Sequence, residues 1–112
     1  MANIFREENG VMIFELEGKI MGTRHDDSLI DRVYEFIEKG KIKFVFDLSK
    51  VEWINSRGLG ICITVYTALN NRGGGFKLSC LSEKVRTFLD NCRMFAVFEA
   101  YDTVEEAIKS FR

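Results

Sequence analysis

The chain has 112 residues and a net charge of -1, and 46% of its residues are hydrophobic, which is enough apolar material for one core. Because acidic and basic residues nearly balance, the composition gives no electrostatic case for binding nucleic acid or an anionic membrane. No apolar run approaches the ~20 residues that cross a bilayer. The first ten residues also lack the basic and apolar regions of a signal peptide. We therefore expect a cytoplasmic protein.

Cysteine and histidine usage argues against metal and redox chemistry. Cys62, Cys80 and Cys92 are an odd number without CxxC spacing, and each has apolar neighbours, so they are expected to be reduced core thiols. His25 is the sole histidine, and a metal site or a Ser-His pair would have to be built on it. We expect neither a metal nor a cofactor.

In the first half of the chain, the pattern predicts two strands, a helix and a third strand. Asn9-Gly10 is a tight-turn signal between the first two strands. Leu29, Val33 and Ile37 recur at helical spacing, and Gly40 is a suitable residue just past a helix end. The predicted elements are strands over Asn3–Arg6 and Val11–Glu17, a helix over Asp26–Lys39, and a buried strand over Ile42–Leu48.

The second half alternates helices and strands. We expect Ser56 to be the N-cap of a helix that runs to about Arg72, because serine is a leading N-cap residue. The remaining predicted elements are a strand over Phe76–Cys80, a helix capped by Ser82, a strand over Ala96–Ala100, and a last helix capped by Asp102 or Thr103.

The resulting order is ββαβαβαβα. After the first strand, strands and helices alternate, which predicts an α/β fold with a mostly parallel sheet, right-handed crossovers and helices on both faces. We expect one domain over residues 1–112, with an N-terminal edge strand and four helices.

The helix after Ser56 is mostly apolar and carries one narrow polar stripe. This pattern predicts a largely buried helix whose small exposed face lies near its start. Ile61 and Ala68 flank the stripe. The stripe consists of Arg57, Gly60, Thr64, Thr67 and Asn71, and the opposite, buried side is expected to hold Leu59, Cys62, Ile63, Tyr66 and Leu69.

Several enzymatic patterns are absent or incomplete. Gly73-Gly74-Gly75 leads into a strand and lacks the Gly-Lys-Ser/Thr ending of a P-loop, so it is a helix stop. A hydrolase nucleophile elbow needs glycine two residues before the serine, where Ile54 stands. Asp47 ends the predicted central strand, as the phosphoacceptor of a response-regulator receiver does. The acidic pair that would hold Mg²⁺ is missing after the preceding strand.

The segment from Asp47-Leu48-Ser49 through Asn55-Ser56-Arg57-Gly58-Leu59-Gly60 is the most specific signal. It resembles the STAS domain of bacterial anti-sigma factor antagonists, in which Asp-Ser-x-Gly-Leu-Gly follows a strand ending in Asp-Leu-Ser. The resemblance extends over essentially the whole chain, and Thr103–Ile108 looks like the closing helix of that family.

The resemblance implies a regulator of transcription that works by partner switching. In that family the motif serine, here Ser56, is phosphorylated by a partner that is both an anti-sigma factor and a serine kinase. The unphosphorylated antagonist binds this kinase and frees the sigma factor, and a serine phosphatase resets it. The domain would then be a substrate and binding module, not an enzyme. Partner binding would involve the motif and the start of its helix, namely Asn55, Arg57, Gly58, Gly60, Ile61 and Thr64.

Two departures from the family motif bear on this role. Asn55 is neutral where the family usually has aspartate, and Arg57 places a charge where a small residue is usual. Both departures bear on the choice of kinase and on whether Ser56 is phosphorylated at all. Beside the switching role, two alternative functions stay open. One is a STAS scaffold subunit of a signalling assembly that does not switch, and the other is a receiver-like phosphorelay domain that uses Asp47.

Overall fold

The computed structural model describes residues 4–20 and 24–111, and the side chains of Ile20 and residues 24–27 lie outside that description. The predicted start at Asn3 and the side chain of His25 therefore fall outside the described residues. The elements are β1 (Ile4–Glu8), β2 (Val11–Ile20), α1 (Arg24–Glu38), β3 (Lys43–Ile54), α2 (Ser56–Asn71), β4 (Gly75–Ser79), α3 (Glu83–Asn91), a 3-10 turn (Met94–Ala96), β5 (Glu99–Tyr101) and α4 (Val104–Lys109).

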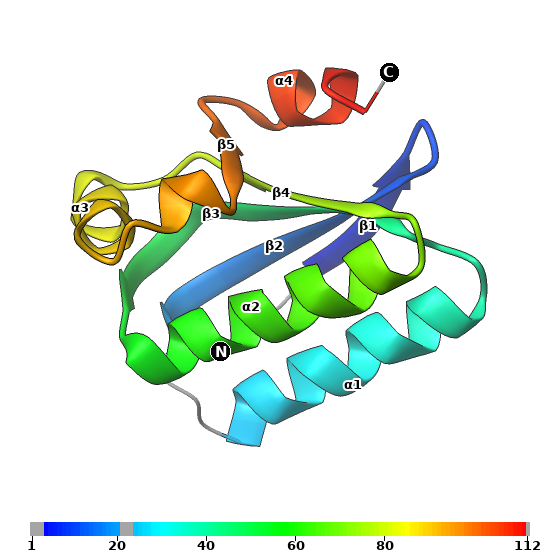
Figure 1. Ribbon diagram of the computed structural model, residues 1–112, viewed down its shortest axis with the longest axis horizontal. Coiled ribbons are helices and arrows are strands. Elements are labelled where there is room, and N and C mark those ends of the chain that lie inside the picture. The colour runs from blue at the N-terminus through cyan, green and yellow to red at the C-terminus, as the bar shows by residue number, and fades with distance from the viewer. Residues whose placement is uncertain (1–3, 21–23, 112) are drawn as a thin grey trace.

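The five strands form one sheet in the sequential order β1-β2-β3-β4-β5 (Figure 1). β1 pairs antiparallel with β2 through the turn at Asn9 and Gly10, whose φ angles of 53° and 79° fit the predicted tight turn. The other neighbouring strands pair in parallel. The predicted element order and the mostly parallel sheet with an N-terminal edge strand are confirmed.

The sequential strand order determines which helices share a face. α1, α2 and α3 each connect parallel neighbours in the same direction across the sheet, and right-handed crossovers then place all three on one side. Their apolar side chains join a single core with the inner side chains of the strands. α4 packs on the opposite face, against Val11, Ile13 and Val45 (Figure 1). Helices therefore cover both faces, as predicted.

Phenylalanine rings form the centre of the larger core. The ring centroids of Phe14 and Phe46 lie 5.7 Å apart in a stacked arrangement, and those of Phe46 and Phe76 lie 4.7 Å apart, edge to face. These rings come from β2, β3 and β4, so Phe46 connects three neighbouring strands. Aromatic pairs of this kind contribute beyond the area they bury.

β3 is longer than predicted, and Asp47 therefore lies at a different position in the strand from the one predicted. The strand continues to Ile54 because β2 extends alongside it, with register shifts on either side of the Gly18 and Val51 pair. Ser49, Lys50 and Glu52 face solvent in this second half, whereas Val51 and Ile54 are buried. Because these polar residues interrupt the apolar run, the sequence predicted that the strand ends at Leu48. Asp47 consequently lies within the strand and does not end it, so that prediction is wrong.

The last strand was also placed too early. The 3-10 turn occupies Met94–Ala96, and β5 begins at Glu99. The predicted caps nearby are confirmed: Ser82 Oγ accepts from the Val85 N–H at 3.2 Å, and Thr103 Oγ1 accepts from the Glu106 N–H at 3.1 Å. Thr103, not Asp102, is the cap of α4.

Removing the ring of Phe46 should destabilise the domain strongly. Phe46→Ala leaves a cavity among rings from three strands, and we expect a loss of about 3–5 kcal/mol in the free energy of unfolding. Ile4→Ala, at a position 49% exposed on β1, should change it by less than about 0.5 kcal/mol. Urea titration followed by circular dichroism measures both, and similar losses in the two variants would contradict this account of the core.

Candidate functional site

The motif lies where β3 passes into α2. Ile54, the last strand residue, is buried, whereas Ser56 and Arg57, the first two residues of α2, are exposed. The sheet thus fixes the end of β3 and presents the start of α2 to solvent. A hydroxyl in this position is accessible to a macromolecular partner.

The cap of α2 is Asn55, so the prediction that Ser56 is the N-cap is wrong. Asn55 has an extended backbone, with φ -114° and ψ -175°, and its Oδ1 accepts from the Gly58 N–H at 2.9 Å. The Leu59 N–H donates to the Asn55 carbonyl at 2.9 Å, which is the first bond of the helix. Asparagine and serine are comparable N-cap residues, and the position at which the strand ends decides between them.

Ser56 therefore does not cap α2. Within the described chain, no hydrogen bond involves its hydroxyl group, and it occupies the first turn of α2 on the exposed side. The first N–H groups of a helix lack intrahelical partners and carry the positive end of the helix dipole. The first turn of α2 contains no acidic residue, and Arg57 is exposed beside Ser56. An added negative charge would meet a favourable field here.

The exposed line of α2 differs from the predicted stripe. Ser56, Gly60, Ile63 and Thr67 follow one another at helical spacing, and all four are exposed. Ile63 is 39% exposed, whereas Ile61, assigned to the partner surface from the sequence, is 6% exposed and belongs to the core. The assignment of Ile61 to an exposed position, and of Ile63 to a buried one, is wrong.

The physical reason is that α2 packs on α1 as well as on the sheet. α1 lies along one side of α2 (Figure 1), so the buried arc is wider on that side than a wheel of α2 alone predicts. Both isoleucines are apolar, and no local signal distinguishes them. Thr64 is partly buried, and its hydroxyl donates to the Gly60 carbonyl at 2.9 Å, while Gly58 is buried.

Gly60 is a helix-interior glycine that packing does not require. A Cβ built at this position would meet nothing within 4 Å, and its φ is not in the left-handed region. Glycine in a helix interior costs roughly 0.5–1 kcal/mol relative to alanine. The missing side chain leaves a flat surface one turn after Ser56, which allows close approach by another molecule.

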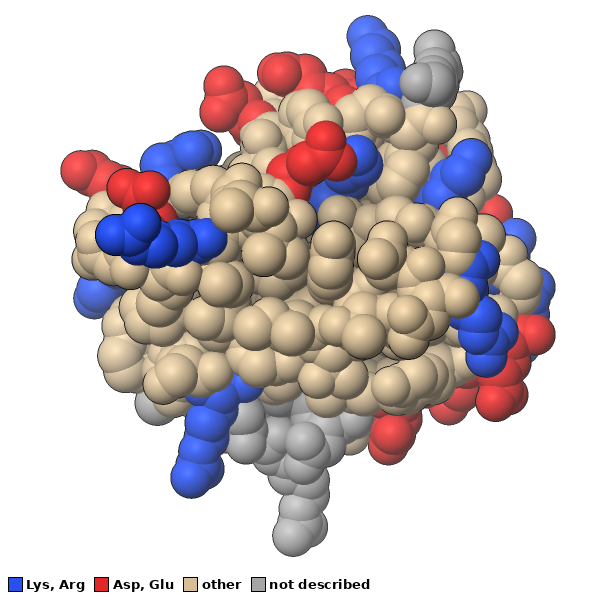
Figure 2. Space-filling model, viewed as in Figure 1, with Lys and Arg blue, Asp and Glu red and all other residues tan. Residues whose placement is uncertain are grey.

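The surface around this line is uncharged. α2 has a single charged residue, Arg57, among its sixteen. Figure 2, in the view of Figure 1, shows that the middle of this face is free of Lys, Arg, Asp and Glu and that charged side chains gather at its rim. Trp53, the sole tryptophan, is 37% exposed three residues before Ser56. A surface depleted in charged residues is typical of the centre of a protein interface.

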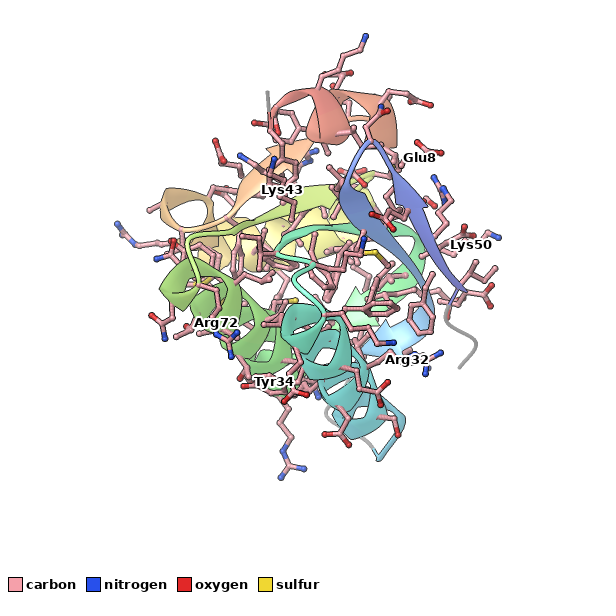
Figure 3. All side chains as sticks on the ribbon, turned by 90° about the vertical axis from the view of Figure 1, so that its right-hand side faces the viewer. Glu8, Arg32, Tyr34, Lys43, Lys50 and Arg72 are labelled. Carbon is pink, nitrogen blue, oxygen red and sulfur yellow. The ribbon has the colours of Figure 1, made fainter. Side chains whose placement is uncertain are left out.

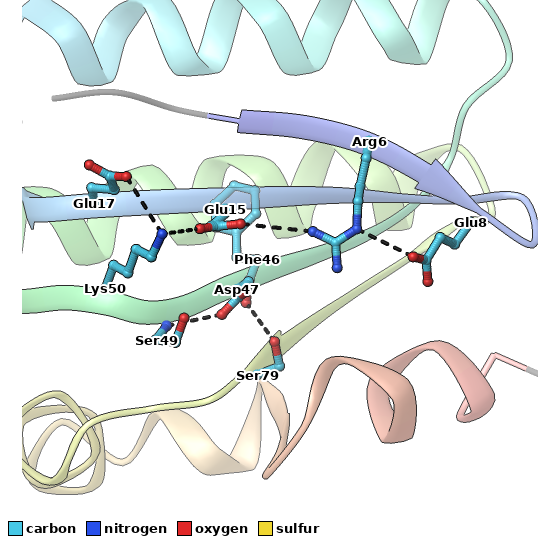
Figure 4. Close-up of polar contacts among 9 residues, drawn as sticks. All are labelled: Arg6, Glu8, Glu15, Glu17, Phe46, Asp47, Ser49, Lys50 and Ser79. Atoms are coloured by element: carbon cyan, nitrogen blue, oxygen red, sulfur yellow. Dashed lines mark hydrogen bonds and ion pairs between the residues drawn. The ribbon is translucent and has the colours of Figure 1, made fainter.

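Asp47 belongs to a different polar cluster, on the sheet face opposite α2 (Figure 4). Asp47 as a residue is 8% exposed, and its carboxylate accepts from the Ser49 N–H at 3.0 Å. Burial raises the pKa of the neighbouring Cys80 thiol, and the Asp47 carboxylate raises it further. The raised pKa favours the neutral Cys80 thiol over the thiolate.

Glu15 stands beside Asp47 in the register of β2 and β3, but two cations neutralise it. Glu15 contacts Lys50 at 2.8 Å and Arg6 at 3.9 Å, and the hydrogen bond to Glu15 raises the pKa of Lys50 (Figure 4). Among the described residues, no three His, Cys, Asp or Glu side chains are grouped to hold a metal ion. This geometry gives Asp47 a structural setting and does not favour a receiver-like role.

Comparison with known proteins defines the family. Residues 4–107 match the STAS domain, so the chain belongs to the STAS domain family. It is 35% identical over 78 residues, 70% of this chain and 69% of the relative, to a Thermotoga maritima protein provisionally named an anti-sigma factor antagonist. The resemblance found in the motif is confirmed, and the relatives place the chain among the anti-sigma factor antagonists.

Solved structures agree with this assignment. A crystal structure of a protein from Thermotoga maritima with that same provisional name superposes with a TM-score of 0.89 at 26% identity, over 96% of this chain and 92% of that one. The antagonist SpoIIAA in its unphosphorylated form gives a TM-score of 0.83 at 18% identity, over 99% and 96% of the two chains, which shows a shared fold. SpoIIAA of Bacillus has also been solved in a phosphorylated form.

No helix in the described ranges, 4–20 and 24–111, combines the length and the apolar character needed to cross a membrane.

The capping assignment makes a clear stability prediction. Asn55→Ala removes the side chain that accepts from the Gly58 N–H and should cost roughly 0.5–2 kcal/mol of unfolding free energy. Ser56→Ala removes no hydrogen bond and should stay within about 0.5 kcal/mol of wild type. Thermal and urea unfolding of both variants tests this prediction. A larger loss of stability in Ser56→Ala than in Asn55→Ala would show that Ser56 caps the helix.

Proposed function

We propose that this domain is a phosphorylation-controlled anti-sigma factor antagonist with Ser56 as the phosphoacceptor. When unphosphorylated, it binds an anti-sigma factor that is also a serine kinase, and so releases the sigma factor. A serine phosphatase returns the phosphorylated form to the binding state. The domain supplies the substrate hydroxyl and the binding surface, and the kinase supplies the chemistry.

The observation that carries this proposal is the division of roles between Asn55 and Ser56. Asn55 holds the helix terminus, so a kinase can engage the Ser56 hydroxyl without breaking a hydrogen bond of the fold. A serine that capped the helix would have to give up that bond each time it was phosphorylated. The curated relatives named as anti-sigma factor antagonists support the same role.

The departure at Asn55 is compatible with this role. The side chain retains the oxygen that accepts from the Gly58 N–H, which an aspartate would also provide, and so the cap is preserved without a negative charge. The first turn of α2 therefore stays free of carboxylates before phosphorylation. A phosphate arriving at Ser56 meets no like charge on its own helix turn.

A phosphate at Ser56 would act through local charge and bulk. It adds about 1.5 to 2 negative charges, at the positive end of α2, where such a contact contributes ~0.3–1 kcal/mol at an exposed site. Arg57 is adjacent and can add a charge-assisted hydrogen bond. The modified domain should stay folded, and partner binding is lost because the charge lies in the interface.

The partner surface proposed here runs along Ser56, Gly60, Ile63 and Thr67. The flat surface at Gly60 lies between Ser56 and the exposed apolar side chain of Ile63. An apolar residue surrounded by uncharged polar ones suits the centre of a transient interface. A partner that reaches Ser56 along this line would also cover Ile63.

Direct phosphorylation tests the proposal. The purified domain is incubated with ATP and a purified anti-sigma factor serine kinase, and the modified residue is located by mass spectrometry. We expect phosphate on Ser56 and none in Ser56→Ala. Stable binding without phosphorylation would instead favour the non-switching scaffold role.

Charge at position 56 should control binding without affecting the fold. Ser56→Ala adds no charge and should bind the kinase as wild type does, whereas Ser56→Asp should bind at least about tenfold more weakly, because desolvating an added charge in an interface is costly. Trp53 provides a fluorescence signal for the titration. Equal affinity of Ser56→Asp and wild type, or a fall of several degrees in its melting temperature, would contradict a local electrostatic switch.

Ile63 should be a principal contact. Ile63→Glu should weaken kinase binding by about tenfold or more while the fold is retained, because it places a charge at the apolar centre of the line. Val97→Glu is the matched control, since Val97 is also 39% exposed but lies beyond α3, next to the 3-10 turn. The proposed line would be wrong if both variants bound alike. Ile61→Glu is unsuitable for this test, because Ile61 is buried and the change would unfold the domain.

A further inference from the structure

A cavity of about 440 Å³ opens at the end of α2 opposite to Ser56. It lies between the second half of α2, the starts of β4 and β5, and the residues that follow α4. Figure 3 faces this end of the molecule and shows Lys43 between α4 above and the end of α2, marked by Arg72, below. α2 is about 24 Å long at 1.5 Å per residue, so the cavity is remote from the phosphoacceptor. Its volume falls in the range of small-molecule sites.

The glycine turn after α2 shapes this cavity but does not form an anion cradle. The N–H groups of Gly73, Gly74 and Gly75 donate to the carbonyls of Asn70, Leu69 and Ile42, respectively. All three donors are therefore used, whereas a phosphate-binding loop needs them free. A Cβ at Gly75 would come within 2.7 Å of the Phe111 ring, so the turn can contribute no side chain there.

Among the described residues that line the cavity, one of the two lysines has no ion-pair partner. Lys77 contacts the Glu99 carboxylate and lies 5.0 Å from the centroid of the Phe111 ring, so its charge is compensated. Lys43 is exposed and forms no ion pair with any described residue. The carbonyl end of α2 also borders the cavity, and it opposes dense negative charge. The cavity can therefore compensate one negative charge on a ligand, but not the several charges of a polyphosphate.

The remaining walls are largely apolar. Tyr66 and Phe111 are partly buried, Phe76 is buried, and Val97 is 39% exposed at the rim. The Tyr66 ring is held edge to face against Phe98, with centroids 5.8 Å apart, so this wall is fixed in place. Apolar walls with a few polar groups are typical of sites that orient a small amphipathic ligand.

We propose that this cavity binds a small amphipathic monoanion, an organic carboxylate or sulfonate, with its apolar part against Tyr66, Phe111 and Val97 and its charge at Lys43. The ligand would be a ring or a short hydrocarbon chain bearing one acidic group. This site is independent of Ser56 and of the proposed switch, because the two lie at opposite ends of α2.

The fluorescent monosulfonate 1-anilinonaphthalene-8-sulfonate is the first probe. We expect saturable binding at one site of the folded full chain, and amide shifts in NMR spectra at Gly73, Gly74 and Gly75. Lys43→Glu should weaken binding about tenfold or more, because an attraction becomes a repulsion. Lys84→Glu, at an exposed lysine of α3 that forms no ion pair with the described residues, is the matched control and should bind as wild type does. Circular dichroism verifies that each variant is folded.

Competition then identifies the ligand class. Indole-3-acetate and octanoate represent ring and chain monoanions, and whichever displaces the probe at lower concentration gives the better class. ATP should compete far less well than either. Val97→Glu should also weaken probe binding, although it is expected to leave kinase binding unchanged. The proposal fails if no saturable site exists, if Lys43→Glu binds as Lys84→Glu does, if the shifts map elsewhere, or if ATP is the best competitor.

Discussion

The pairing of β2 with the second half of β3 is the constraint on which the candidate site depends. β4 pairs with β3 only through Asp47, so beyond that residue β3 is held by β2 and by the burial of Val51 and Ile54. Ile54 fixes where the strand ends, and the extended backbone of Asn55 follows from it. The cap, the first turn of α2 and the exposure of Ser56 are all consequences of this placement.

The helix cap and the proposed phosphoacceptor are two adjacent residues with different surroundings. Asn55 stabilises the helix terminus, an effect of about 0.5–2 kcal/mol for such caps. Ser56 contributes little to the fold, so modification of its hydroxyl costs little stability. In the proposed function, this arrangement would allow a phosphate to be added and removed at a helix start that stays formed. The helix dipole and Arg57 would then stabilise the added charge locally.

α2 connects two surfaces of different chemistry. Its start carries the exposed line of Ser56, Gly60 and Ile63 on an uncharged face, and its end borders the cavity that contains Lys43. The stability of the fold does not require the residues that shape either surface. Gly60 has open space around it, and Lys43 has no ion-pair partner among the described residues. Features that the fold does not need are the ones that point to binding.

The sequence determined the order of the elements, the turn at Asn9 and Gly10, the caps at Ser82 and Thr103, and the motif that identifies the family. These features depend on neighbouring residues and on periodicity, which are local properties. The scarcity of charge in α2 also predicted a mostly buried helix, and that prediction is wrong: six of its sixteen residues are buried, and exposed residues occur from its start to its end.

Only the tertiary structure decided where β3 ends, whether Asn55 or Ser56 caps α2, and whether Ile61 or Ile63 is exposed. The end of β3 depends on how far β2 runs beside it, and the cap depends on the backbone angles set at that end. The exposed face depends on α1, which covers one side of α2 from a distant part of the chain. The helical pattern in the sequence gives the spacing of buried residues, but contacts with other elements decide which face of the helix is buried.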